Sequence, residues 1–105
     1  MRFTLALAIG ATLTLLPGVA HADSIDGTWC SPDIRSLSIE GPKIITPGRH
    51  QILGNYGRHD FTYTVPPGED GAGSPVAMLL INEQTVQIRF GAGAIETWRR
   101  CQVIS

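Results

Sequence analysis

Hydrophobic and polar residues alternate in short runs along most of this chain, and glycine, proline or asparagine interrupts the pattern every few residues. Leu37 and Ile39 alternate with serine, and Val86, Ile88 and Phe90 lie two positions apart. A two-residue period is typical of strands with one buried face, and no window has a helical stripe of useful length. The pattern predicts an all-β protein with about eight strands, near residues 25–30, 35–40, 43–46, 50–53, 56–65, 76–81, 85–90 and 94–103.

The connections between these strands predict the architecture. Pro47-Gly48 indicates a type II turn with a positive φ at the glycine. The run 76–81 is apolar throughout, which indicates a strand buried on both faces. Strands joined by tight turns form a meander, and a meander this small exposes two edges unless its first and last strands pair. We therefore predict a small antiparallel up-and-down β-barrel.

Residues 1–22 have the features of an export signal. A positive Arg2 is followed by an apolar run, a break at Pro17-Gly18 and a small-residue site that ends at Ala22. The alternative, a permanent membrane helix, is disfavoured because the run is short and poorly flanked. We expect a single β-barrel domain over 23–105, a periplasmic or secreted location, and no membrane span in the mature chain.

The charge of the mature chain is small. Without residues 1–22, nine acidic and seven basic residues remain, which is a net charge of −2 with histidine neutral. The sequence has neither a basic stripe nor an acidic tail. Nucleic acids and anionic membranes are therefore not expected as partners.

The two cysteines, Cys30 and Cys101, predict one structural disulfide in an exported protein. It would close a loop over nearly the whole mature chain, for which the chain-entropy model gives about 4 kcal/mol. A redox pair usually lies in a C-x-x-C motif, and a structural zinc site needs four ligands. The sequence has neither pattern, so we expect no metal site and no cofactor.

Both tryptophans lie beside the cysteines, in the segments DGTWC (26–30) and ETWRRC (96–101). Because side chains alternate across a strand, a disulfide on one face of the paired end strands places Trp29, Trp98 and Arg100 together on the other. A guanidinium over an indole contributes about 0.5–2 kcal/mol. Glu96 shares that face and is expected to pair with Arg100.

Gly27-Thr28-Trp29 resembles the G-x-W signature on the first strand of lipocalin-like (calycin) barrels. In that family an arginine of the last strand packs across the tryptophan, a role that the resemblance gives to Arg100 or Arg99. The chain is much shorter than an ordinary lipocalin, so its barrel would be too narrow for a large hydrophobic ligand. In size and layout it is also similar to the small periplasmic lysozyme inhibitors, without their Ser-Gly-x-x-Tyr motif, and to short exported bacterial proteins of unassigned function.

A candidate pocket lies in the segment NYGRHDFTYTVPP (55–67), where His59, Phe61 and Tyr63 share one face of the predicted strand. One interpretation is a packed core with His59 hydrogen-bonded at the barrel end, and the other is a ligand pocket with His59 and Tyr63 as polar groups. His59 and Asp60 point to opposite faces, so they do not form a catalytic pair. With no nucleophile and base in a recognisable arrangement, we do not expect an enzyme.

The predicted loop 66–75 carries Glu69 and Asp70 between glycines. Its spacing does not match an EF-hand calcium loop, and two adjacent carboxylates are typical of a solvated turn. The loop is long for so small a domain, and long loops on rigid scaffolds often carry recognition. Acidic residues in such a loop would suit a basic target such as lysozyme.

These features predict an exported, non-catalytic β-barrel that binds a protein or a small molecule. Two alternatives remain open. One is inhibition of a lysozyme-like or other exported hydrolase, and the other is a structural or stress-related role in the cell envelope.

Overall fold

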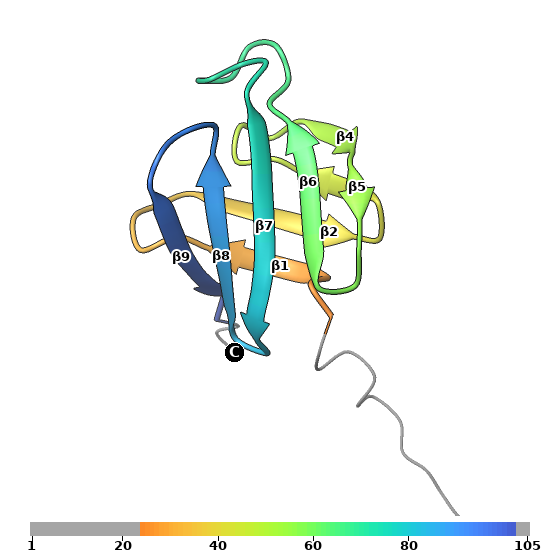
Figure 1. Ribbon diagram of the computed structural model, residues 1–105, viewed down its shortest axis with the longest axis vertical. Coiled ribbons are helices and arrows are strands. Elements are labelled where there is room, and N and C mark those ends of the chain that lie inside the picture. Colours follow the sequence, from red (N-terminus) through yellow and green to blue (C-terminus); the bar gives the residue numbers. More distant parts are fainter. Residues whose placement is uncertain (1–23, 103–105) are drawn as a thin grey trace, which may run out of the picture.

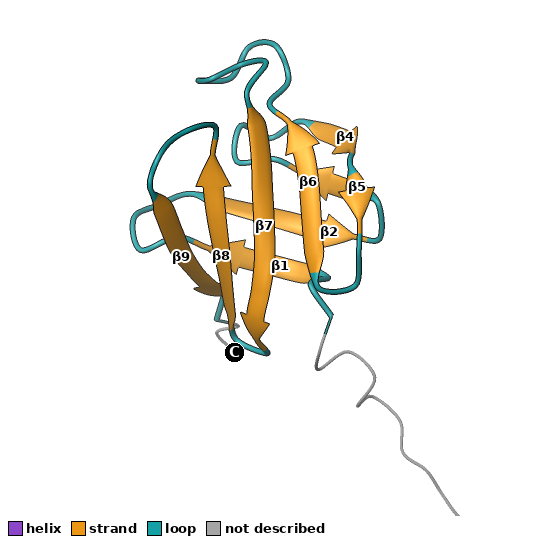
Figure 2. Ribbon diagram, viewed as in Figure 1, coloured by secondary structure: helices purple, strands orange, loops and turns teal. Residues whose placement is uncertain are grey.

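The computed structural model describes residues 24–102, which form an all-β protein without a helix (Figures 1 and 2). The predicted signal segment, 1–22, and the end of the predicted last strand at Val103 lie outside the described residues. The strands are β1 (Gly27–Cys30), β2 (Ser36–Glu40), β3 (Lys43–Ile45), β4 (Gln51–Leu53), β5 (Asn55–Tyr56), β6 (Asp60–Thr64), β7 (Pro75–Asn82), β8 (Thr85–Phe90) and β9 (Ile95–Arg100).

All nine described strands belong to one antiparallel sheet in the order β4-β3-β2-β1-β9-β8-β7-β6-β5. The sheet curls into a nearly closed barrel, in which β1 and β2 cross behind β6, β7 and β8 (Figure 1). β1 pairs with β9, with Trp29 opposite Arg100, so the predicted pairing of the first and last strands is confirmed. The free edges belong to β4 and β5. Gly54, the residue that connects β4 to β5, donates its N–H to the carbonyl of Pro42 in the β2–β3 turn at 2.8 Å.

The predicted long strand 56–65 is two strands. The chain turns after β5, where the Gly57 N–H donates to the Asp60 carbonyl at 2.8 Å, and it returns antiparallel as β6. Asn55 faces Thr62 and Tyr56 faces Phe61 across this hairpin. The described residues thus form nine strands where about eight were predicted, because a strand-like composition conceals this turn.

Alternation decides which side chains fill the barrel. The inward positions of β2, β6 and β8 are those that the two-residue period predicts, and polar side chains alternate with them. The core consists of Ile25, Trp29, Leu37, Ile39, Ile44, Phe61, Tyr63, Val65, Val76, Met78, Val86, Ile88 and Trp98.

The prediction that residues 76–81 are buried on both faces is wrong. Met78 points inward and is 2 % exposed, while its neighbour Leu79 is 50 % exposed on the outer surface. Ala77 and Ile81 share that outer face. β7 is paired on both edges, by β6 and β8, but no other element of the described chain covers its outer face. The run of apolar residues therefore reflects the position of β7 in the middle of the sheet and does not mean that both of its faces are covered.

The two ends of the barrel wall are joined as the parity argument predicts. Cys30 and Cys101 form a disulfide with Cα atoms 5.0 Å apart. Trp29 and Trp98 are fully buried in the core, and the Arg100 guanidinium lies 4.3 Å from the centre of the Trp29 ring.

Arg100 also ties three backbone segments together. Its guanidinium donates to the carbonyls of Asp26, at 2.7 Å, and of Ser24, at 2.8 Å, and a third bond reaches the Glu83 carbonyl. Gly27 makes this approach possible, because it has φ +124° and a Cβ there would lie 2.5 Å from Arg100 Nη1. The glycine and tryptophan of the G-x-W segment therefore both contact the same arginine.

The turn after β3 differs from the predicted type II turn. Thr46 accepts a hydrogen bond from the Arg49 N–H at 2.9 Å and donates its own N–H to His50 at 2.9 Å. The positive φ, +75°, belongs to Arg49 and not to Gly48. Gly48 serves a steric purpose instead, because a Cβ there would lie 2.2 Å from the Glu69 carboxyl carbon.

Candidate functional site

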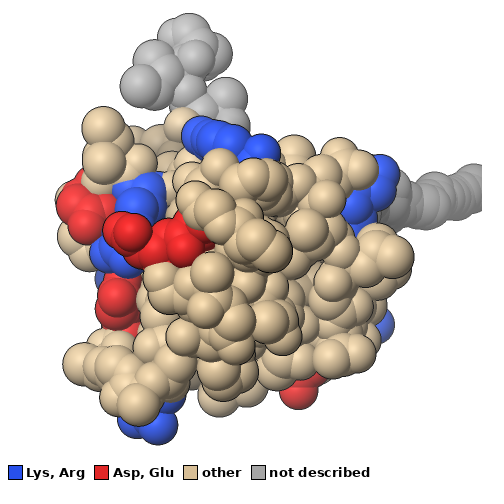
Figure 3. Space-filling view, turned by 90° about the horizontal axis from the view of Figure 1, so that it is seen from above, with Lys and Arg blue, Asp and Glu red and all other residues tan. Residues whose placement is uncertain are grey.

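One end of the barrel carries a cavity of about 560 Å³, between the turn 46–50 and the loop 66–74. This end is the upper one in Figure 1 and faces the viewer in Figure 3, where acidic and basic side chains lie next to one another on the left and further basic side chains lie at the top and at the right edge. The wall combines apolar and aromatic residues with charged ones. The lining residues are Arg35, Pro47, Gly48, Tyr63, Val65, Gly68, Glu69, Asp70, Phe90 and Glu96.

Arg35 is the basic residue of this wall, and the loop between β1 and β2 holds it in place. Asp33 accepts hydrogen bonds from the Arg35 backbone N–H at 3.0 Å and from its guanidinium at 3.0–3.2 Å. Ser31 is buried, donates its hydroxyl to Asp33 and accepts from the Arg35 N–H at 3.1 Å. Hydrogen bonds from Arg35 and Ser31 lower the pKa of Asp33, so the carboxylate stays ionised at neutral pH.

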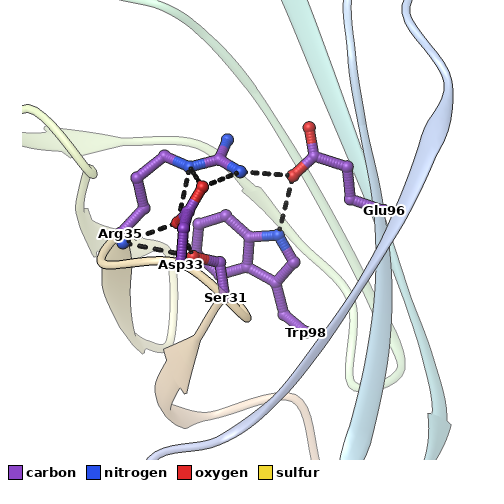
Figure 4. Close-up of polar contacts among 5 residues, drawn as sticks. All are labelled: Ser31, Asp33, Arg35, Glu96 and Trp98. Atoms are coloured by element: carbon purple, nitrogen blue, oxygen red, sulfur yellow. Dashed lines mark hydrogen bonds and ion pairs between the residues drawn. The ribbon is translucent and has the colours of Figure 1, made fainter.

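Glu96 joins Arg35 to the core (Figure 4). Its Oε1 accepts from Arg35 Nη2 at 2.9 Å and from the Trp98 indole N–H at 3.1 Å. The guanidinium lies 5.2 Å from the centre of the Trp98 ring and 5.8 Å from that of Phe90. The bond to Asp33, and then that to Glu96, raises the pKa of Arg35.

The predicted pairing of Glu96 with Arg100 is therefore wrong. Glu96 and Arg100 do lie on the same face of β9, but Arg100 is occupied at the other end of that strand by backbone carbonyls. Arg35 reaches Glu96 from the β1–β2 loop, 61 positions away in the sequence. Sequence alternation predicted the face of Glu96 but not its partner.

Glu69 folds back toward the barrel instead of pointing into solvent. Its side chain is only 9 % exposed, and its Oε2 accepts from the buried Thr46 hydroxyl and lies 2.5 Å from His50 Nδ1. Burial alone would raise the pKa of Glu69, but the hydrogen bonds from Thr46 and His50 outweigh it and the pKa is lowered. The bond ties loop 66–74 to turn 46–50, so Glu69 is not available as an acidic contact for a partner, while Asp70 is exposed.

Of the three residues predicted as a pocket, Phe61 and Tyr63 are neighbours in the core, and His59 lies apart from them. Phe61 is fully buried in the core, with its ring centre 6.5 Å from that of Tyr56 and 6.4 Å from that of Tyr63. His59 lies outside β6, in the exposed turn that follows β5, and its carbonyl accepts from Leu80 at 2.8 Å. Only Tyr63 lines the cavity.

Tyr63 has an unusual environment. The residue is 5 % exposed, and its hydroxyl makes no hydrogen bond with any part of the chain that the structure describes. Burial, and then the nearby Glu69 carboxylate, raises the pKa of Tyr63 well above its usual range. Buried polar groups normally have a partner, so a neutral, unpaired hydroxyl at a cavity wall is a site where an incoming group would bond.

Five residues of this end were not predicted from the sequence as part of a site: Arg35, Thr46, His50, Phe90 and Glu96. A local signal exists for Arg35, because serine and aspartate four and two positions before it are the residues that form side-chain turns. The others become neighbours through sheet curvature, for which the sequence has no comparable local signal.

Two further observations concern the described residues. Residues 24–102 contain no group of three or more His, Cys, Asp or Glu side chains placed to hold a metal ion. No helix in this range is long and apolar enough to cross a membrane. Comparisons with protein-family models, curated proteins and solved structures find no match to this chain.

Proposed function

We propose that this protein is an exported, non-catalytic binding module and that the cavity at the barrel end is its binding site. The observation that carries this proposal is Tyr63, a buried residue of the cavity wall whose hydroxyl makes no hydrogen bond within residues 24–102. A hydroxyl that makes no hydrogen bond within the described residues is able to bond to a ligand group, and such a bond contributes about 0.5–1.5 kcal/mol.

The polar groups around Tyr63 support the proposal because they are already held in place. Asp33 and Glu96 position Arg35, and Thr46 positions Glu69. Side chains that are ordered before binding lose little conformational freedom when a ligand arrives. A volume of about 560 Å³ also suits a small organic ligand.

The proposed export has two supports of different kinds. The segment 1–22 has the charge, apolar run and small-residue site of an export signal. The Cys30–Cys101 disulfide suits an oxidising compartment such as the periplasm or the exterior.

Two-dimensional NMR of the mature protein with a library of small compounds tests the binding proposal. We expect ligands to shift the signals of Phe90 and Trp98, and Tyr63→Phe to weaken those ligands without loss of stability. Tyr56→Phe is the matched control, because its hydroxyl bonds to Asp26 outside the cavity. A library without a single cavity ligand contradicts the proposal and favours a structural role in the envelope.

Inhibition of an exported hydrolase is the second candidate function. Loop 66–74 is shaped by its own hydrogen bonds, among them Ala72 N–H to Glu69 at 3.0 Å and Ser74 N–H to Gly71 at 2.9 Å, and it presents Asp70 to solvent. A preformed loop that presents the Asp70 carboxylate suits the cleft of a basic enzyme. Lysozyme and cell-wall substrate, with the protein at micromolar concentration, test this directly. An unchanged rate excludes lysozyme as the target.

A further inference from the structure

The charge of the cavity is unbalanced. Glu69, Asp70 and Glu96 contribute three carboxylates to its wall, and Arg35 is the one Lys or Arg side chain among its lining residues. The positive charge of Arg35 is already shared between Asp33 and Glu96. The group of Asp33, Arg35 and Glu96 thus has a net charge of −1, and apolar walls strengthen the field of the remaining carboxylates.

Several acceptor atoms of this wall remain available within the described part of the chain. Both hydrogen bonds of Glu96 within the described residues use Oε1, which leaves Oε2 without a partner there, and in Figure 4 this oxygen points away from Trp98. The Asp70 carboxylate is exposed and makes no hydrogen bond or ion pair within residues 24–102. The Tyr63 hydroxyl is a third acceptor that makes no hydrogen bond within the described residues, and it belongs to a buried neutral residue of β6.

An ammonium group is the chemical complement of this arrangement. It carries three N–H donors and no acceptor, so it matches acceptor oxygens and not further donors. The rings of Tyr63 and Phe90 also line the cavity, beside Val65. Aromatic faces attract cations, and apolar walls accept the aliphatic stem of an amine.

We infer that the cavity binds a primary ammonium group carried on an apolar stem, an inference that rests on the proposed function of the cavity. The source is either a free amine or a lysine side chain of a protein. Glu96 and Tyr63 contact the ammonium, Phe90 contacts the stem, and Asp70 attracts the cation at the entrance.

A charge series of one shape tests the ligand class. Hexylamine, hexanol and hexanoate have the same stem with a positive, neutral or negative end at pH 7. We titrate each into the mature protein at low salt and follow Trp98 signals by NMR. Hexylamine is expected to bind at least about tenfold more tightly than hexanol, and hexanoate most weakly. Nα-acetyl-lysine amide distinguishes the two sources, because it binds as well as hexylamine only if the cavity accepts a lysine side chain.

Matched variants locate the charge. Glu96→Gln keeps an oxygen for Trp98 and removes one charge, and we expect it to weaken hexylamine about tenfold. Asp70→Asn, at an exposed site without packing, should weaken it severalfold with an unchanged unfolding midpoint. Glu83→Gln removes the same charge in the β7–β8 turn, at the end of the barrel opposite loop 66–74 (Figure 1), and should leave binding unchanged.

The outcomes separate the inference from the proposed function. If hexanol or hexanoate binds as tightly as hexylamine, the ammonium class is wrong and the cavity remains a binding site. An equal loss in Glu83→Gln and Asp70→Asn also overturns the inference, because it indicates diffuse attraction by net charge. If none of the probes and no library compound binds, the proposed function fails as well.

Discussion

At the scale of single residues, an arginine lies over a buried tryptophan at two places, and different groups hold the two arginines. Arg100 covers Trp29 and Arg35 covers Trp98, so each buried indole of the joined end strands has a guanidinium over it. Backbone carbonyls hold Arg100, which makes it part of the barrel wall. Carboxylates hold Arg35 at the edge of the cavity. Arg100 is therefore part of the barrel wall, whereas Arg35 lines the cavity and holds Glu96 there.

Replacing Arg100 by alanine should lower the free energy of unfolding by about 2–4 kcal/mol, because it removes bonds to three carbonyls and the contact with Trp29. Arg100→Lys keeps the charge but not the planar fork, and about half of the loss should persist. Denaturant unfolding measures both. Arg99→Ala is the control: Arg99 is exposed on the outer face, and its change should stay within about 0.5 kcal/mol. Equal losses at the two positions would contradict the assigned role.

Glu69 makes stability depend on pH. Because its folded pKa lies below the ordinary value of 4.5, the unfolded chain binds more protons between these two pKa values. The contribution of Glu69 is complete above pH 4.5 and is lost as the pH falls through the folded pKa. Glu69→Gln should therefore reduce stability at pH 7 and flatten its decline toward pH 3.

Denaturant unfolding at pH 7, 4.5 and 3 checks this prediction. Asp26 and Asp33 also have lowered pKa values, and they contribute to the loss of stability at low pH in the wild type and in the variant alike. The difference in unfolding free energy between the two proteins therefore isolates Glu69. Asp70→Asn changes a neighbouring exposed carboxylate and should leave the curve unchanged. A constant difference at all three values of pH would refute the role of the Glu69 charge.

At the scale of elements, alternation is reliable for which face of a strand points inward and unreliable for what covers the other face. β2, β6 and β8 follow the predicted pattern. In β7 the outward residues are apolar as well, so the pattern alone could not distinguish a covered face from an exposed one. The turn that divides β5 from β6 was missed for a related reason, since His59 and Asp60 extend the alternation across it.

Adjacent positions of β7 test the two faces. Met78→Ala should cost about 2–5 kcal/mol, because it opens a cavity in the core. Leu79→Ala, one residue away and half exposed, should cost less than about 1 kcal/mol. Thermal and denaturant unfolding of the two variants measures the two losses in the free energy of unfolding. A large loss at Leu79 would mean that its outer face is covered in solution.

At the scale of the whole molecule, the barrel is closed by the pairing of its first and last strands, and the opening lies between two strands that are consecutive in the sequence. β1 and β9 are paired and joined by the disulfide, while the free edges are those of β4 and β5, which are consecutive in sequence. The covalent chain itself keeps β4 and β5 together through Gly54. β1 and β9 are far apart in the sequence, so the Cys30–Cys101 disulfide provides the covalent link between them.

Removing the disulfide should destabilise the fold strongly. It joins residues 71 positions apart, and the chain-entropy model gives about 4 kcal/mol for such a loop, a large share of the 5–15 kcal/mol typical of a domain. Unfolding of the oxidised protein, the reduced protein and a double variant, Cys30→Ala with Cys101→Ala, measures the effect. Unchanged midpoints would show that pairing of β1 with β9 and the contact of Arg100 with Trp29 suffice.

The sequence by itself determined the all-β class, the faces of most strands, the disulfide, and the contact of Arg100 with Trp29. These features depend on the alternation of side chains within single strands and on the pairing of the only two cysteines, which can be recognised from short segments of the sequence. Of the candidate site, only Tyr63, Glu69 and Asp70 were anticipated, and Glu69 has a different role from the predicted one.

Only the tertiary structure decided which side chains meet at the barrel end. The partner of Glu96, the contact of Glu69 with His50 and Thr46, and the unpaired hydroxyl of Tyr63 all depend on how far the sheet curls. Curvature is a property of all strands together, since it sets which inward positions of distant strands face one another. Alternation places a side chain on the inner face, but the neighbour across the barrel is chosen by the closed shape.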